Sequence, residues 1–192
     1  MSTFRLVNGE YSLDLTLDEA HILINLAEQL LELLGEGDFS HHYTSDDPFA
    51  QIMASLGGEH FGSEIAPPED DVLKRLLPNA YADPESSADF RRYTEQSIRS
   101  KKIAILREIR EELSTIVDSD RAGEINDLDP DSWLLGINDL HLALAVRLDV
   151  DENSFELFES LSDEEPQKAI FAVYFWLGWL QESLLEILDL HS

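Results

Sequence analysis

The chain has 192 residues, 43% of them apolar, which fits a single folded domain. Its 40 acidic and 13 basic residues give a formal net charge of −27, which repels nucleic-acid phosphates and anionic lipids and favours basic partners. It contains no cysteine, so it has no disulfide, no thiolate nucleophile and no cysteine zinc site.

The first predicted element is a β-hairpin over residues 4–15. Its turn is Asn8-Gly9, two residue types that accept the positive φ angles of a tight hairpin turn. In this register Phe4 faces Leu13, and one face of the ribbon is apolar. Two strands alone are marginal in water, so the hairpin is expected to lie on helices.

A helix is predicted to follow, from Thr16 to Leu34. Thr16 and Glu19 have the spacing of a capping box, and Gly35 is the residue type that commonly ends a helix. Apolar side chains recur at helical spacing and form a wide stripe for burial at Ile22, Leu23, Leu26, Leu30, Leu33 and Leu34.

Residues 36–66 are rich in glycine, histidine, aspartate and serine, and we predict a flexible excursion with one short helix over residues 48–56. His41, His42 and His60 lie there among carboxylates, and imidazole and carboxylate are competent zinc or nickel ligands. Because these histidines lack a metal-binding spacing, we predict a solvated loop and no metal, with a metal as the alternative.

Further helices are predicted after Asp151 and over residues 67–77, 87–117, 130–148 and 166–190. The helices over 130–148 and 166–190 are apolar on nearly all sides, so both are expected to be central and to pack on each other. The fold class is therefore mainly α: a single-domain helical bundle, residues 1–192, with an N-terminal β-hairpin.

The basic residues are concentrated in one helix. Residues 90–110 hold seven basic residues against two acidic ones, a net charge of +5. One hypothesis is a docking face for an acidic partner or a phosphate, which would include Arg91, Arg92, Arg99, Lys101 and Lys102. The alternative, which we favour, is that acidic segments fold over this helix and pair with it. Duplex DNA is disfavoured, since no helix-turn-helix signature accompanies the segment.

Two polar residues, Asn138 and Asp139, interrupt the apolar helix over residues 130–148. Burial of an unpaired carboxylate costs several kcal/mol, so a buried Asp139 needs a cation, which Arg99 or Lys102 can supply. We favour a buried ion pair that fixes the helix register. The alternative is a ligand or anion site at this junction, and with it an enzyme or a small-ligand-binding protein.

No common catalytic motif is present: the GxSxG, P-loop, GxGxxG and EF-hand patterns do not occur. We therefore predict no cofactor and favour a non-enzymatic protein over an enzyme. His21 and His141 lie on predicted helices, and we interpret both as packing residues. The chain start shows no signal-peptide pattern, and the apolar C-terminal segment is too short to span a membrane, so we expect a cytoplasmic protein without a membrane partner.

Several stretches of the chain resemble one known family. They are the capped first helix, Leu76 to Tyr81, Arg91 to Leu106, Trp133 to Leu144 and Trp176 to Leu184. On these residues the chain resembles an uncharacterised actinobacterial family, domain of unknown function 2017. It departs from the family pattern at His141 and Ala145, where a basic residue and a glycine are expected, and residues 36–66 match little.

The resemblance implies little about activity, because the family has no assigned activity and no agreed catalytic residues to carry over. Its members are labelled loosely as transcriptional regulators and are commonly encoded beside the adaptor of the Clp protease, which implies a role near regulated proteolysis. Together with the residues, this predicts a non-enzymatic interaction or regulatory protein with a protein partner. The sequence does not identify that partner, and it leaves a homo-oligomer open.

Overall fold

The computed structural model describes residues 2–35, 68–79, 83–119 and 121–190. Six helices and three short strands lie within these residues, and the fold is mainly α with an N-terminal hairpin, as predicted. The expected excursion over residues 36–66, with its short helix and with His41, His42 and His60, lies outside the described residues.

The N-terminal hairpin consists of β1 (Phe4–Val7) and β2 (Glu10–Leu15). Phe4 pairs with Leu13, which confirms the predicted register. Asn8 and Gly9 have φ angles of 56° and 90°, the positive values that the turn requires.

A third strand, β3 (Gly123–Asn126), pairs antiparallel with β2 and gives the sheet order β1-β2-β3. Sequence analysis did not predict it. The strand has four residues with one apolar side chain, Ile125, which is too short an alternation to mark a strand. The strand lies in the connection between the helices over residues 84–118 and 130–147, and the ends of these helices place it beside β2.

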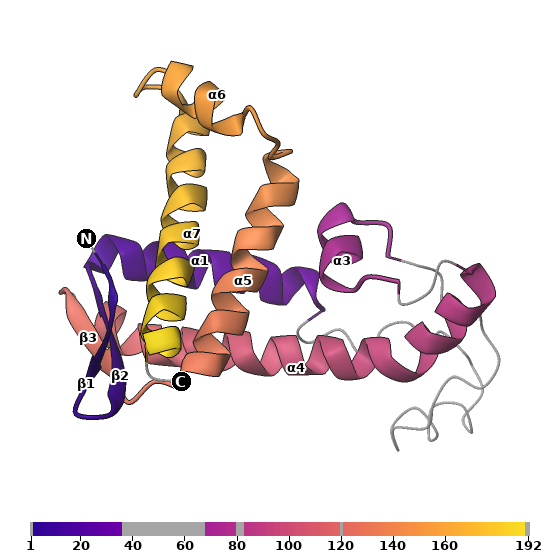
Figure 1. Cartoon of the computed structure of the whole chain (residues 1–192), viewed down its shortest axis with the longest axis horizontal. Coiled ribbons are helices and arrows are strands. Elements are labelled where there is room, and N and C mark those ends of the chain that lie inside the picture. Colours follow the sequence, from indigo (N-terminus) through magenta and orange to yellow (C-terminus); the bar gives the residue numbers. More distant parts are fainter. Residues whose placement is uncertain (1, 36–67, 80–82, 120, 191–192) are drawn as a thin grey trace.

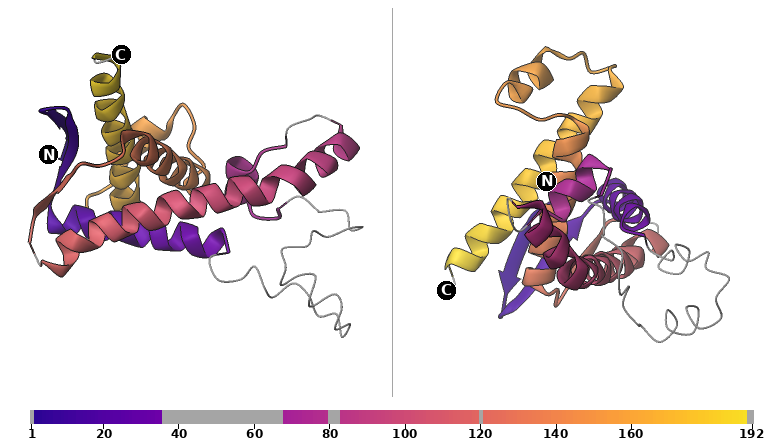
Figure 2. Two further views of the ribbon diagram at one scale, coloured as in Figure 1. Left: turned by 90° about the horizontal axis from the view of Figure 1, so that it is seen from below. Right: turned by 90° about the vertical axis from the view of Figure 1, so that its right-hand side faces the viewer.

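The helix α1 (Leu17–Leu33) begins and ends as predicted. The Thr16 hydroxyl accepts a hydrogen bond from the Glu19 amide at 3.2 Å, and the Glu19 carboxylate accepts one from the Thr16 amide at 2.8 Å. Gly35 follows with a φ of 83°. This helix lies along α4 (Pro84–Asp118), the longest helix of the described residues (Figures 1 and 2).

Two helix starts differ from their predicted positions. The helix α3 (Asp71–Leu76) begins later than predicted, because Asp70 is its N-cap and accepts from the Val72 amide at 2.8 Å. The long helix α4 begins three residues earlier than predicted, at Pro84, a residue type that suits the first turn of a helix.

Three helices form an arm that stands away from α1 and α4: α5 (Pro130–Arg147), α6 (Ser154–Ser160) and α7 (Pro166–Leu190). The helices α5 and α7 pack on each other, as predicted, and α6 lies at the far end of the arm (Figure 1). The carboxylate of Asp129 caps α5 by accepting from the Ser132 amide at 3.1 Å.

The main core lies at the foot of the arm, where the sheet meets the helices. Trp133 of α5 is fully buried there and makes an edge contact with Phe4 of β1, with ring centroids 5.8 Å apart. Only the first half of α5 is buried, however, since residues 141–148 are at most partly covered. The prediction of a central helix holds for the first half of α5, whereas the second half is only partly buried, because its side chains face α1 across a groove.

Candidate functional site

Arg99, a predicted interface residue, connects α4 to the end of α1. Its guanidinium donates to the backbone carbonyl of Leu34 at 3.1 Å and to the carboxylate of Glu95 at 2.8 Å. Leu34 is the C-cap of α1, where the helix dipole presents partial negative charge, so a cation there stabilises the helix. Arg99 therefore has an internal structural role.

Lys102 of α4 and Asp139 of α5 form an ion pair. The ammonium of Lys102 lies 2.7 and 2.8 Å from the two carboxylate oxygens of Asp139. Asp139 is 4% exposed, and burial raises the pKa of its carboxyl against the opposing effect of Lys102. The sequence argument that a buried Asp139 needs a cation from the basic helix is confirmed for Lys102.

The other basic candidates are not brought to this pair. Lys101, next in sequence to Lys102, is exposed. Arg91 and Arg92 belong to α4, but their side chains are outside the described part of the structure. Partner binding by these three residues stays a prediction.

Asn138 lies in a polar network between α5 and α7. Its side-chain carbonyl accepts from the Gln181 amide at 3.3 Å, and the Gln181 carbonyl lies 3.3 Å from Nδ1 of His141. Burial lowers the pKa of His141, which keeps its imidazole neutral near neutral pH. The network links the two arm helices, and His141 is a packing residue, as predicted.

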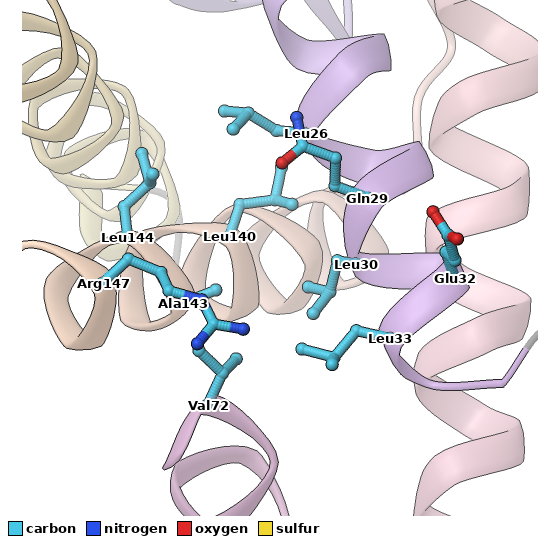
Figure 3. Close-up of a pocket in the computed structure, with 10 residues that line it drawn as sticks. All are labelled: Leu26, Gln29, Leu30, Glu32, Leu33, Val72, Leu140, Ala143, Leu144 and Arg147. Atoms are coloured by element: carbon cyan, nitrogen blue, oxygen red, sulfur yellow. The ribbon is translucent and has the colours of Figure 1, made fainter. Parts of the chain in front are cut away.

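A groove that sequence analysis did not predict opens between α1, α3 and α5 (Figure 3). Its volume is about 480 Å³. The leucines of α1 point across it toward α5 (Figure 3). The lining residues are mostly apolar: Leu26, Gln29, Leu30, Glu32, Leu33, Val72, Leu140, Ala143, Leu144 and Arg147.

The groove continues between α1 and α7 as a second hollow of about 890 Å³. The two hollows share Leu26, Gln29, Leu144 and Arg147. His21 lines the second hollow and is exposed, so the interpretation of His21 as a packing residue is wrong. It lies on the side of α1 that the arm leaves partly open.

An ion pair connects two of the helices around the groove. The guanidinium of Arg147 at the end of α5 lies 2.8 Å from the carboxylate of Asp70 at the start of α3. Its hydrogen bond to Asp70 lowers the pKa of that carboxyl. Arg147 is also exposed to the groove, which is an apolar channel bordered by this ion pair and by the carboxylate of Glu32.

The sequence did contain a signal for this groove. The predicted stripe on α1 is wider than the face that is buried, and Ile22, Leu26 and Leu33 are only partly covered. The helix α5 is apolar on nearly all sides, although only its first half enters the core. Both helices have more apolar surface than their neighbours cover. Where the two helices diverge, this surface lines an apolar channel.

The geometry offers no metal centre within the described residues, where no group of three histidine or carboxylate side chains is placed to hold an ion. No helix in the same residues has the length and apolar character needed to cross a membrane. Outside the described ranges, His41, His42 and His60 are untested as metal ligands.

The model of one protein family, described as "Domain of unknown function (DUF2017)", matches residues 1–188. Two relatives share 30% of their residues with this chain, over 88% of this chain and 78% of their own length. Both are named "Oxidative stress regulator AosR", one from Mycobacterium tuberculosis and one from Mycobacterium bovis. No solved structure matches the chain significantly.

Proposed function

Because the chain belongs to the DUF2017 family, whose mycobacterial relatives are named as regulators, we propose that it is a non-enzymatic regulatory protein that acts by binding a protein partner. The proposed binding site is the groove between α1, α3, α5 and α7. This proposal is more specific than the relatives' names, which identify no partner.

The observation that carries the proposal is the apolar surface of the groove that none of the described residues covers. Its two connected hollows are lined mainly by leucine, isoleucine, valine and alanine side chains from four helices. A concave, mostly apolar groove between helices is a common place for a protein to bind a ligand or a partner segment. A short apolar segment of a partner would fill the channel and remove that surface from water.

The absence of cysteine limits how a regulator of oxidative stress could work in this chain. Thiolates are the usual reversible targets of oxidants, and these 192 residues contain none. If the function resembles that named for the relatives, an oxidative signal does not act on these residues through a thiol.

The two more specific sequence hypotheses gain no support from the geometry. In the ligand-site alternative, an anion would bind at the junction of α4 and α5, but the carboxylate of Asp139 already occupies the position beside the Lys102 ammonium. The connection with Clp-type proteolysis rests on family resemblance alone and stays a prediction.

The test compares two leucines on opposite faces of α5. Leu144 lines both hollows, whereas Leu135 is 44% exposed, lies outside them and is displaced by about 180° around the helix. A photo-crosslinking amino acid replaces each leucine in turn in cells of the native host. We expect position 144 to give a discrete crosslinked protein that position 135 does not give.

The identified partner is then titrated against the purified chain and against two variants, Leu144→Gln and Leu135→Gln. We expect Leu144→Gln to weaken binding by about tenfold or more and Leu135→Gln to leave it unchanged. Thermal unfolding of both variants verifies that each is folded. Equal crosslinking at both positions, or equal affinities of both variants, would show that the groove is not the binding site.

A further inference from the structure

The far end of the arm, formed by α6 and the loops on either side of it, combines exposed apolar side chains with strong negative charge. Residues 149–165 contain eight carboxylates and no basic residue. This arm tip, as we call residues 149–165, lies at the opposite end of α7 from the sheet and the main core (Figure 1).

A satellite cluster of aromatic rings holds α6 on α7. Phe155 and Phe158 of α6 contact Phe175 of α7, with ring centroids 5.6 and 5.2 Å apart. Lys168 places its ammonium 5.7 Å from the centre of the Phe158 ring. No apolar side chain of α6 is fully buried, and the helix is held on α7 by these ring contacts and by Lys168, whose ammonium donates to the backbone carbonyl of Leu161 at 2.8 Å.

Two apolar side chains of the arm tip are presented to solvent. Phe155 is 56% exposed and Leu157 is 42% exposed, and they lie on different sides of α6. Ordinary helix packing would bury at least one of them. The arm tip thus retains apolar surface that none of the described residues covers.

The carboxylates of the arm tip differ in how far they are used internally. Asp151 accepts hydrogen bonds from Asn153 and Ser154, and Asp163 pairs with Lys168 at 2.8 Å. Three other carboxylates, Glu152, Glu156 and Glu159, are exposed and form no ion pair with the described residues. These three leave uncompensated negative charge around Phe155, and Glu159 lies one helical turn after Phe155 on the same side of α6.

We propose that the arm tip is a second docking surface, whose partner is a basic amphipathic helix of another protein. The apolar side of that helix would contact Phe155, and its lysine or arginine side chains would face the neighbouring Glu152, Glu156 and Glu159. Charge selects this occupant, because nucleic acid, an anionic membrane and a second copy of this acidic tip would all be repelled. The inference does not depend on the groove.

The probe for the test is a synthetic amphipathic helix with leucines on one face and arginines on the other. Its control is the same peptide with glutamates in place of the arginines. Fluorescence anisotropy of the labelled peptides measures binding to the complete chain at several salt concentrations. We expect the arginine peptide to bind with an affinity that falls as salt rises, and the glutamate peptide not to bind.

Two charge-matched variants separate the arm tip from the general acidity of the chain. One is Glu152→Gln/Glu156→Gln/Glu159→Gln. The other is Glu182→Gln/Glu186→Gln/Asp189→Asn, which removes three exposed carboxylates around an exposed leucine, Leu185, at the opposite end of α7. We expect about tenfold weaker binding of the arginine peptide by the first variant and less than about a twofold change for the second.

The apolar half of the surface is tested by Phe155→Ser, which should weaken binding at every salt concentration, whereas Leu157→Ser, on the other side of α6, should leave binding unchanged. The groove variant Leu144→Gln should leave the affinity for the arginine peptide unchanged. The proposal for the groove and the proposal for the arm tip can therefore fail independently. Equal loss of affinity in the two charge-matched variants would mean that the peptide follows total charge and would overturn the proposal. Binding to anionic vesicles, or self-association that the tip variants abolish, would overturn it in favour of a membrane or a second copy.

Discussion

Lys102 and Asp139 meet in a pair in which one ammonium contacts both oxygens of a buried carboxylate. The two partners differ in exposure, because the Lys102 side chain is 20% exposed whereas Asp139 is almost fully buried. Lys102 can reach water without its partner, whereas Asp139 cannot. The loss of Lys102 and the loss of Asp139 therefore have different consequences for stability. The pair fixes α4 against α5 below the groove.

The first prediction concerns this asymmetry. Lys102→Met leaves a buried carboxylate without its cation and should lower the free energy of unfolding by about 3–5 kcal/mol. Asp139→Asn leaves a lysine that can turn toward solvent and should cost clearly less. The double variant Lys102→Met/Asp139→Leu should recover most of the loss. Urea unfolding of the three variants measures these differences, and an equal cost for both single variants would contradict the argument.

The second prediction concerns the pH dependence of the same variant. Burial holds the pKa of Asp139 above its ordinary value of 3.8, so between the two values the folded chain binds more protons than the unfolded chain. Stability from this group therefore falls as pH rises through that window. In Lys102→Met nothing offsets the burial, and the cost of the variant should shrink on acidification. Asp139→Asn, which has no carboxyl to titrate at this position, is the reference. If the stability cost of Lys102→Met did not change with pH relative to that variant, the prediction would be refuted.

Features set by a few neighbouring residues could be predicted from the sequence. The hairpin register, the Thr16 and Asp129 caps and the end of α1 at Gly35 all depend on side chains within a few positions. The cation beside Asp139 could also be inferred, because the cost of an unpaired buried charge does not depend on the details of the fold.

What could not be predicted depends on contacts between distant segments. The strand β3 is defined by its pairing with β2, more than a hundred residues earlier, and its own sequence is nearly featureless. The groove exists because α5 leaves the core after Leu140, and no local pattern shows where an apolar helix leaves its neighbours. The exposure of His21 is a consequence of the same divergence.

The third prediction concerns His141, whose imidazole is partly buried between α5 and α7. Burial lowers its pKa below the ordinary value of 6.5, so below that pH the unfolded chain binds the proton more readily. Stability from this group is fully present above about 6.5 and is lost as pH falls toward the lowered pKa. The stability difference between the parent chain and His141→Gln should therefore change in that range. A difference that stays flat across it would show that His141 is not buried in its neutral form.

The fourth prediction concerns Gly136, where α5 crosses α4. A Cβ at this position would overlap Cδ1 of the buried Ile109. Gly136→Ala should therefore lower the free energy of unfolding by about 1–2 kcal/mol, even though alanine favours the helix. Adding Ile109→Val removes the overlapping methyl group and should recover part of the loss. If Gly136→Ala were stabilising in thermal unfolding, the crossing would be looser than the structure has it.

The fifth prediction concerns Trp133, whose indole N–H donates to the carboxylate of Glu112 at 2.6 Å. Burial raises the pKa of Glu112, while the hydrogen bond from Trp133 opposes that effect. Glu112→Gln keeps an acceptor without the charge and should leave stability at neutral pH unchanged or slightly higher. Glu112→Leu leaves a buried donor unpaired and should cost about 1–3 kcal/mol. Because Trp133 also contacts Phe4, its fluorescence, isolated in a Trp176→Phe/Trp179→Phe background, reports whether the foot of the arm stays attached to the sheet. Equal stability of the two variants would mean that water replaces Glu112 as the acceptor and that the foot of the arm is less tightly packed than its burial indicates.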